Sequence, residues 1–283
     1  MTSLAGPEPL IDVHAHFYPD VGGRPDSRHL NARRLEAGDR IGITVHVASM
    51  LGTFGVTSPT YFQSPADTRP ANDEMLQRQH GDARIRSYVA VNPNDMAFAV
   101  AEVDRCAAAG AIGLKLAAAR RCDDPVVWPV VERADAHGFP VLHHIWQHRR
   151  RHWPSQDISD GADLAVLAAR FPRVAFILAH IGGGGDYLHT FAAVREVPNI
   201  YLDLSGSGID RGMLDDALAA VGPQRLLWGA DLTLCTGLAK LWALSVIGLS
   251  NDDLADIRWR NAVRIFPPGA FGDLGSRQAT IPS

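Results

Sequence analysis

The stretch Leu10-Ile-Asp-Val-His-Ala-His-Phe17 places two histidines, two residues apart, at the end of an apolar run. The apolar residues predict a buried strand over Ile11–Phe17, and the Tyr-Pro-Asp that follows indicates an exit into a loop. Side chains two residues apart on a strand point to the same face of the sheet. His14 and His16 could therefore bind one metal ion together. The alternative is two histidines that merely share a partly buried surface.

Seven further apolar runs follow this strand, with helix-like segments between them. Strands are predicted at Ile43–Ser49, Ile85–Val91, Ala111–Leu116, Val141–Trp146, Val174–His180, Ile200–Leu204 and Leu226–Gly229. Helices are predicted at Asn72–His80, Phe98–Ala109, Pro125–His137, Asp163–Phe171, Tyr187–Glu196 and Gly212–Val221. Continuous apolar strands that alternate with helices indicate a parallel sheet covered on both faces. Eight such units in 283 residues predict a single α/β domain over residues 1–283, a (β/α)₈ TIM barrel, with an open doubly wound sheet as the competing architecture.

Composition excludes several classes of protein. A formal net charge of −4 argues against non-specific nucleic-acid binding, which needs an excess of Lys and Arg. Cys106, Cys122 and Cys235 lie far apart, without zinc-knuckle spacing, and we expect reduced thiols. The first residues lack a secretory pattern, and no apolar run is long enough to span a bilayer. We therefore expect a cytoplasmic protein that binds neither nucleic acid nor a membrane.

Polar residues stand at or near the ends of several other apolar strands. They are Lys115, the adjacent pair His143 and His144, His180, and Asp231. Burying a charge or an imidazole there costs free energy unless the group is paired or ligated. Because the carboxyl ends of barrel strands converge on one mouth, these separate residues predict a single site.

These segments together resemble the amidohydrolase superfamily. The similarity is greatest to the amidohydrolase-related branch that includes aminocarboxymuconate-semialdehyde decarboxylase and pyrone-dicarboxylate lactonase. The matching segments are Ile11-Asp-Val-His-Ala-His16, Val91-Asn-Pro93, Pro140-Val-Leu-His-His144, Phe176-Ile-Leu-Ala-His-Ile-Gly-Gly183, Leu227-Trp-Gly-Ala-Asp231 and Asn261-Ala-Val-Arg-Ile-Phe266. They cover nearly the whole chain in the family's order, which is more specific than any single motif.

The resemblance implies a set of metal ligands. His14 and His16 would be two of them, and His144 the third, because the family histidine lies four residues after the proline of its Pro-Val motif. Adjacent residues on a strand face opposite ways, so His143 is expected to point away from the metal. Asp231 would be the fourth ligand and could accept a proton from water, with a helix N-cap as its structural alternative.

Two further residues depend on how many ions the site holds. In relatives with one metal, the residue matching His180 stays off the ion and orients water or shuttles a proton; in relatives with two, it binds the second ion. Lys115 would be a carboxylated bridge between two ions in the second case. In the first, its cation would neutralise a substrate carboxylate, with its pKa lowered by the field of the metal. We favour one metal and leave the two-metal site open.

Weaker candidates for substrate binding are Arg120 and Arg121, after the fourth predicted strand, and Trp146, for which packing against a barrel helix is equally consistent. The run Arg149–Arg151 is more typical of a solvated surface. His46 has no clear family counterpart and is expected in the core or lining the pocket.

Together these residues predict a metal-dependent hydrolase. One divalent ion, Zn²⁺ in preference to Mn²⁺, would activate water against an ester, lactone or amide carbonyl of a small anionic substrate, with His180 and Asp231 moving protons. A metal-dependent non-oxidative decarboxylase of a small carboxylic acid is the alternative. A non-catalytic barrel with a structural or sensory metal is a third. In relatives, a proline often occurs after the strand-eight aspartate, and in many decarboxylases a histidine follows. The segment Asp231-Leu-Thr-Leu-Cys235 contains neither residue. This departure slightly weakens the decarboxylase alternative. The resemblance also implies a homodimer, by analogy only.

Overall fold

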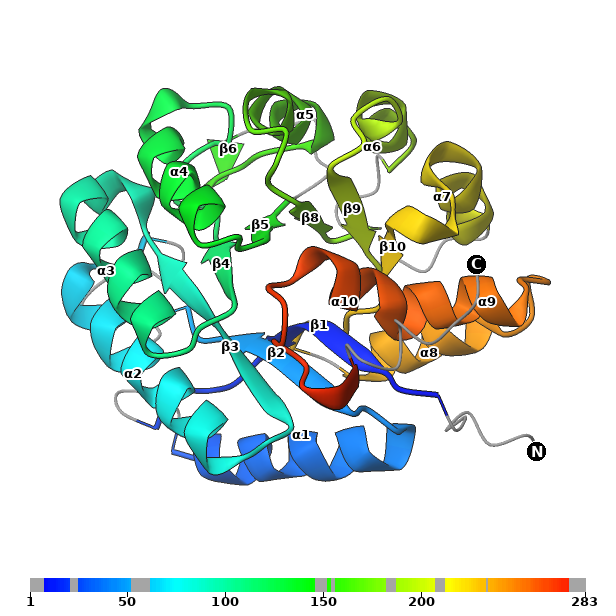
Figure 1. Ribbon diagram of the computed structural model, residues 1–283, viewed down its shortest axis with the longest axis horizontal. Helices are drawn as coiled ribbons and strands as arrows, with labels where there is room; N and C mark the ends of the chain where they lie inside the picture. Colours follow the sequence, from blue (N-terminus) through cyan, green and yellow to red (C-terminus); the bar gives the residue numbers. More distant parts are fainter. Residues whose placement is uncertain are drawn as a thin grey trace.

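The computed structural model describes residues 8–20, 25–51, 62–145, 152–153, 156–181, 187–206, 212–232 and 234–274. Eight parallel strands form a nearly closed barrel surrounded by helices, which confirms the predicted TIM barrel (Figure 1). In sheet order the strands are β1 (Ile11–His16), β2 (Val45–Ser49), β3 (Ile85–Val91), β4 (Gly113–Leu116), β5 (Val141–His144), β8 (Phe176–Ala179), β9 (Ile200–Asp203) and β10 (Leu226–Leu227). Each lies within a predicted strand.

The seam of the barrel joins β1 to the segment that follows β10. The backbone N–H of Val13 donates to the carbonyl of Trp228 at 3.1 Å, and that of Asp231 donates to the carbonyl of His14 at 2.6 Å. Ala15 and Asp231 form an isolated parallel bridge. The seam therefore brings a histidine from one end of the chain beside an aspartate from the other.

Helices follow most strands and cover the outside of the barrel (Figure 1). They are α1 (Ser27–Ile41), α2 (Pro65–Gly81), α3 (Met96–Ala108), α4 (Trp128–Ala136), α5 (Gly161–Arg170), α6 (Tyr187–Val194), α7 (Met213–Val221), α8 (Leu234–Leu244), α9 (Asn251–Ala255) and α10 (Asn261–Ile265). Short helical turns are η2 (Pro93–Asp95), η3 (Pro125–Val127), η4 (Pro223–Arg225) and η5 (Asp256–Arg260), and a small antiparallel pair is formed by β6 (His152–Trp153) and β7 (Gln156–Asp157). No helix in the described residues has the length and apolar character needed to cross a membrane.

The start of α2 corrects one expectation. The sequence predicts a helix from Asn72, after an irregular stretch that ends at Pro70. The helix instead begins at Pro65, because the Ser64 hydroxyl caps it by accepting from the N–H of Asp67, and a proline is compatible with the first helical position. Pro70 lies inside the helix.

Apolar packing fills the barrel and its shell. The larger cluster joins strand residues such as Leu114 and Phe176 to helix residues such as Val131. A second cluster joins the alternate strand positions, including Leu142, to Phe266 near the carboxyl terminus of the chain. Aromatic side chains from the last helical segment therefore contribute to the core of the barrel.

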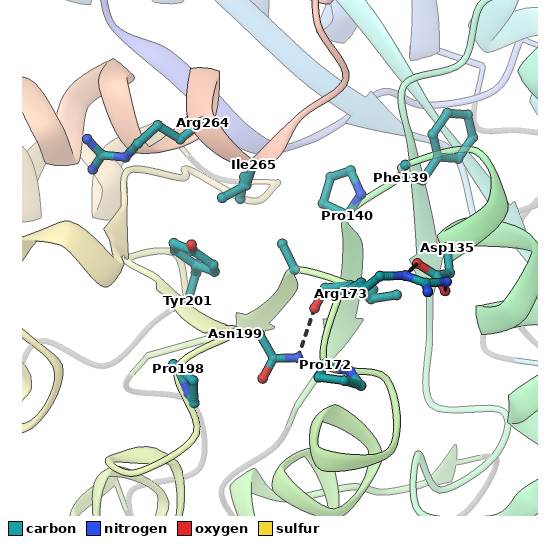
Figure 2. Close-up of a pocket in the computed structure, with 13 residues that line it drawn as sticks. Asp135, Phe139, Pro140, Pro172, Arg173, Pro198, Asn199, Tyr201, Arg264 and Ile265 are labelled. Atoms are coloured by element: carbon teal, nitrogen blue, oxygen red, sulfur yellow. Dashed lines mark hydrogen bonds and ion pairs between the residues drawn. The ribbon is translucent and has the colours of Figure 1, made fainter.

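A cavity of about 360 Å³ lies at the amino ends of β5, β8 and β9. Its lining includes Pro140, Pro172 and Tyr201 (Figure 2). Arg173 at its edge pairs with Asp135, as Figure 2 also shows. Substrates of TIM-barrel enzymes bind at the opposite, carboxyl end of the strands, so we do not assign this cavity to catalysis.

Candidate metal centre

The residues predicted for the site converge at the carboxyl ends of the strands. The Nε2 atom of His14 lies 3.1 Å from Nε2 of His16 and 3.2 Å from Nζ of Lys115. On the other side of the cluster, Nε2 of His180 lies 3.2 Å from Nδ1 of His144. The rings of His14 and His180 stack with centroids 4.9 Å apart, which joins the two halves.

Asp231 lies beside His14 and His16, the two histidines of β1. Its Oδ1 atom lies 3.4 Å from Nε2 of His16 and 3.7 Å from Nε2 of His14. Ligand atoms about 2.1 Å from one ion lie roughly 3.0–3.4 Å from each other in octahedral or tetrahedral geometry. The three donor atoms therefore fit a single divalent ion with little movement.

Hydrogen bonds at the Nδ1 atoms of His14 and His16 set the tautomer of each imidazole ring. Nδ1 of His14 lies 2.6 Å from Oδ2 of Asp203, and Nδ1 of His16 lies 3.1 Å from the carbonyl oxygen of Ser49. Because both partners accept, each ring carries its proton on Nδ1 and presents a bare Nε2. Burial lowers the pKa of His14 well below its ordinary value and that of His16 to about 4, so both rings are neutral. Two lone pairs that face each other at 3.1 Å suit a bound cation.

Asp231 is held in an unusual backbone conformation, with φ of 58°. Aspartate tolerates the left-handed region better than most residues. Burial raises the pKa of Asp231, but the electrostatic influence of the neighbouring His14, His16 and Lys115 outweighs burial, and the pKa is lowered. The group is therefore an anion at neutral pH, as a metal ligand or a proton acceptor must be.

His180 contacts both halves of the cluster. Its Nδ1 lies 2.8 Å from the Ser205 hydroxyl and 3.8 Å from Oδ2 of Asp231. His14, His180 and Asp231 each offer a ligand atom, all within 4.8 Å of one another. Burial lowers the pKa of His180 and of His144 well below the ordinary value. The arrangement is compatible with a proton-transfer role for His180 and also with a second ion.

His143 and His144 differ as their alternation on the strand predicts. Nδ1 of His143 donates to the carbonyl of His144 at 2.9 Å, whereas His144 contacts His180 through its ring. Burial lowers the pKa of His143 to about 4. His144 is thus the member of the pair that reaches the cluster.

Lys115 is almost completely buried, with 1% of its surface exposed. Burial lowers its pKa to about 8, although the nearby Asp231 and Asp203 oppose the shift. An amine with that pKa is uncharged in part of the population at neutral pH. Lys115 therefore suits either of its predicted roles, because carboxylation requires a neutral amine and substrate recognition a charged one.

Sequence reasoning missed Asp203 and Ser205, which follow the apolar start of β9. The Ser205 hydroxyl donates to Oδ2 of Asp203 at 2.5 Å, and Asp203 is fully buried beneath His14. Burial raises the pKa of Asp203 to about 6, against the opposing effects of His180 and Ser205. A Cβ at Gly229 would lie 2.1 Å from Oδ1 of Asp203, which explains the glycine in the strand-eight motif. A polar residue at the end of an apolar strand was the available signal.

A buried lysine from α8 supports the same network. Nζ of Lys240 donates to the carbonyls of Ser205 and Gly206 at 2.8 and 2.7 Å. Burial lowers the pKa of Lys240 to about 8, with Asp203 and Asp231 acting in the opposite direction. It fixes the loop that carries the Ser205 hydroxyl.

Two of the weaker substrate-binding candidates, Arg120 and Arg121, are paired with neighbouring side chains. Arg120 donates to Asn94, and Arg121 forms ion pairs with Asp123 and with Asp163 of α5. Trp146 and the run 149–151 lie outside the described residues. His46 is buried, with Nδ1 3.5 Å from Oδ2 of Asp12.

Comparison with known proteins places this geometry in context. A family model described as amidohydrolase matches residues 11–267. Among solved structures, 5-carboxyvanillate decarboxylase from Sphingomonas paucimobilis has 19% sequence identity and a TM-score of 0.68, over 91% of this chain and 98% of that chain. Dihydroxybenzoic acid decarboxylase from Polaromonas sp. JS666, solved with bound manganese and the inhibitor 2-nitroresorcinol, has 19% identity and a TM-score of 0.67, over 91% of this chain and 96% of that chain.

A hydrolase candidate shares the fold as well. A Pseudomonas putida protein proposed to be a 2-pyrone-4,6-dicarboxylic acid hydrolase has 17% identity and a TM-score of 0.55, over 90% of this chain and 96% of that chain. A search of curated protein sequences found no match. At these identities, the solved structures establish a shared fold and leave the reaction open.

Proposed function

We propose that this chain, which belongs to the amidohydrolase family, is a metal-dependent hydrolase that cleaves an ester, lactone or amide bond of a small anionic substrate. The observation that carries the proposal is the pair of neutral imidazoles of His14 and His16. Their Nε2 atoms face each other at 3.1 Å, with the carboxylate of Asp231 beside them.

The metal would be held by His14, His16 and Asp231, with His144 as a further ligand. Neutral imidazole and carboxylate suit Zn²⁺ and Mn²⁺, and a decarboxylase of the same fold binds manganese. When bound, such an ion polarises a carbonyl and lowers the pKa of a coordinated water molecule toward 7.

Proton transfer falls to Asp231 and His180. Asp231 is ionised and takes the proton from the attacking water. Its Oδ2 lies 3.8 Å from Nδ1 of His180, so a small side-chain movement brings the two within reach of a shared proton as the leaving group departs. The bond between carbonyl carbon and leaving group breaks as the carbon gains the water oxygen.

Lys115 indicates the charge of the substrate. In the one-metal site that we favour, its buried ammonium group pairs with a carboxylate of the substrate. The alternative is a carboxylated Lys115 that bridges two ions, with His144 and His180 on the second. Nζ lies 3.2 Å from a proposed metal ligand, which supports both arrangements.

A non-oxidative decarboxylase is the second candidate, because several of the solved structures similar to this chain are decarboxylases of aromatic acids. In that reaction the same site would bind the carboxylic acid, and a proton would replace the departing carboxylate.

The two candidates differ in their products. Protein loaded with Zn²⁺ or Mn²⁺ is incubated with a panel of lactones, esters, amides and hydroxybenzoic acids, and hydrolysis products and released CO₂ are both quantified. We expect ring opening or ester cleavage of a carboxylate-bearing substrate. Release of CO₂ without hydrolysis would establish the second candidate, and activity that survives loss of His14 would contradict both.

A further inference from the structure

A buried ion pair lies directly behind the candidate metal centre. Arg34 of α1 and Asp12 of β1 join through Nη2 and Oδ2 at 2.8 Å, and their side chains are 7% and 0% exposed. We infer that Arg34 and Asp12 form a positioning pair that holds His14 and Asp231 at the spacing one metal ion requires. This inference rests on the proposed metal-dependent function.

Asp12 binds both sides of the barrel seam. Its Oδ1 atom accepts from the backbone N–H of His14 at 3.2 Å and from that of Ala230 at 3.0 Å. One carboxylate oxygen therefore joins the strand that carries the two histidines to the residue that precedes Asp231.

Arg34 holds Asp231 from the other direction. Its Nη1 donates to the carbonyl of Asp231 at 2.7 Å and to that of Leu232 at 3.2 Å. The N–H of Asp231 is bound as well, to the carbonyl of His14 at 2.6 Å. With both backbone polar groups fixed, the left-handed conformation of Asp231 is maintained and its carboxylate is aimed at the histidines.

Stability alone does not account for this pair. A buried ion pair gains little over well-packed apolar residues of similar volume, because desolvating two charges offsets most of their attraction. The pair adds directed hydrogen bonds to two strands that meet at the seam. The planar guanidinium of Arg34 reaches Asp12 and Asp231 at once, which the single ammonium group of a lysine cannot reproduce.

The test compares Arg34→Met with a matched control, Arg225→Met. Arg225 also donates to backbone carbonyls, those of Val194, Arg195 and Val197, but it lies near the amino end of β10. For each metal-stripped protein we measure the Kd for Mn²⁺ and Zn²⁺ by calorimetry, and the thermal unfolding midpoint. We expect R34M to raise Kd about 10- to 100-fold, as loss of a residue that orients a metal ligand does. R225M should lower the midpoint and leave Kd unchanged, because Arg225 contacts no proposed metal ligand.

Arg34→Lys provides the same comparison if R34M does not fold. It keeps the positive charge beside Asp12 but loses the second contact, so its Kd should lie between those of the parent and R34M. An unchanged Kd in R34M or R34K would overturn the inference, as would an equal loss of affinity in R225M. A parent protein that binds neither ion would instead contradict the proposed function, and the positioning pair with it.

Discussion

The two ends of the barrel use their polar side chains differently. Near the amino ends of the strands, the Asn199 amide donates to the carbonyls of Ala168, Phe171 and Val174. The Asn261 amide near the same end also donates to two backbone carbonyls. At the carboxyl ends, polar side chains face one another: four imidazoles, a lysine and an aspartate, mostly buried.

The difference indicates where stability and function reside. Amides that satisfy backbone carbonyls stabilise the fold whether or not a ligand is present. The opposed Nε2 lone pairs of His14 and His16 repel each other unless a cation lies beside them. In TIM barrels the amino end is the stability face and the carboxyl end the catalytic one, and the proposed metal centre of this chain lies at the carboxyl end.

The largest effect is expected at the carboxyl end, from replacing His14 with alanine. The variant loses a metal ligand, so bound metal should fall to a small fraction of an equivalent and turnover by at least about a thousandfold, because the pKa of water returns from about 7 toward 15.7. Elemental analysis and the product assay measure both. The control is His189→Ala, a histidine on α6 whose side chain is 56% exposed. A His14 variant that keeps its metal would contradict the assignment of His14 as a metal ligand at the carboxyl end of the barrel.

Replacing His180 with asparagine separates proton transfer from metal binding. Metal content should stay at the parent level, while kcat falls about 10²- to 10⁴-fold through loss of an acid–base group. Metal content and kcat are measured on the same preparation. A loss of half the metal from a protein that holds two equivalents would establish the two-metal site with Lys115 as bridge.

The sequence supported most of the fold, because eight apolar runs separated by helix-like segments leave few other architectures. It also located His14, His16, His144, His180 and Asp231 at strand ends. The predicted start of α2 was wrong, because Ser64 caps a helix that begins at Pro65 and continues through Pro70, where a break was expected. Which of these groups contact one another depends on strand register and ring orientation, which no local pattern encodes.

Two residues that support the candidate site were not predicted from the sequence. Asp203 could have been predicted, because it is a polar residue at the end of an apolar strand, but it lies outside the motifs of the resemblance. Arg34 carried no such signal, since its contact with Asp12 depends on how α1 is rotated against the barrel.

Asp203→Asn tests the support beneath the ring of His14. The amide cannot match the carboxylate as an acceptor for Nδ1–H, so the Kd for Mn²⁺ or Zn²⁺ should rise about 10- to 100-fold while the fold persists. Calorimetric titration measures the affinity, and circular dichroism checks the fold. Asp215→Asn, at an exposed position of α7, is the matched control. Equal Kd values for both variants would remove Asp203 from the site.

The smallest functional effect is expected at the amino end, from Asn199→Ala. Three carbonyls lose a donor, so the free energy of unfolding should fall by about 1–3 kcal/mol. Metal affinity should stay unchanged. Urea unfolding and metal titration provide the two values. A higher Kd for the metal in this variant would contradict the division between a stabilising amino end and a metal-binding carboxyl end.

The most direct test of the metal centre is anomalous diffraction from crystals grown with Mn²⁺. We predict a manganese peak about 2.0–2.3 Å from Nε2 of His14, Nε2 of His16 and a carboxylate oxygen of Asp231. Crystals grown at saturating Mn²⁺ that show no peak at this position, or that bind manganese only elsewhere, would contradict the proposed metal centre.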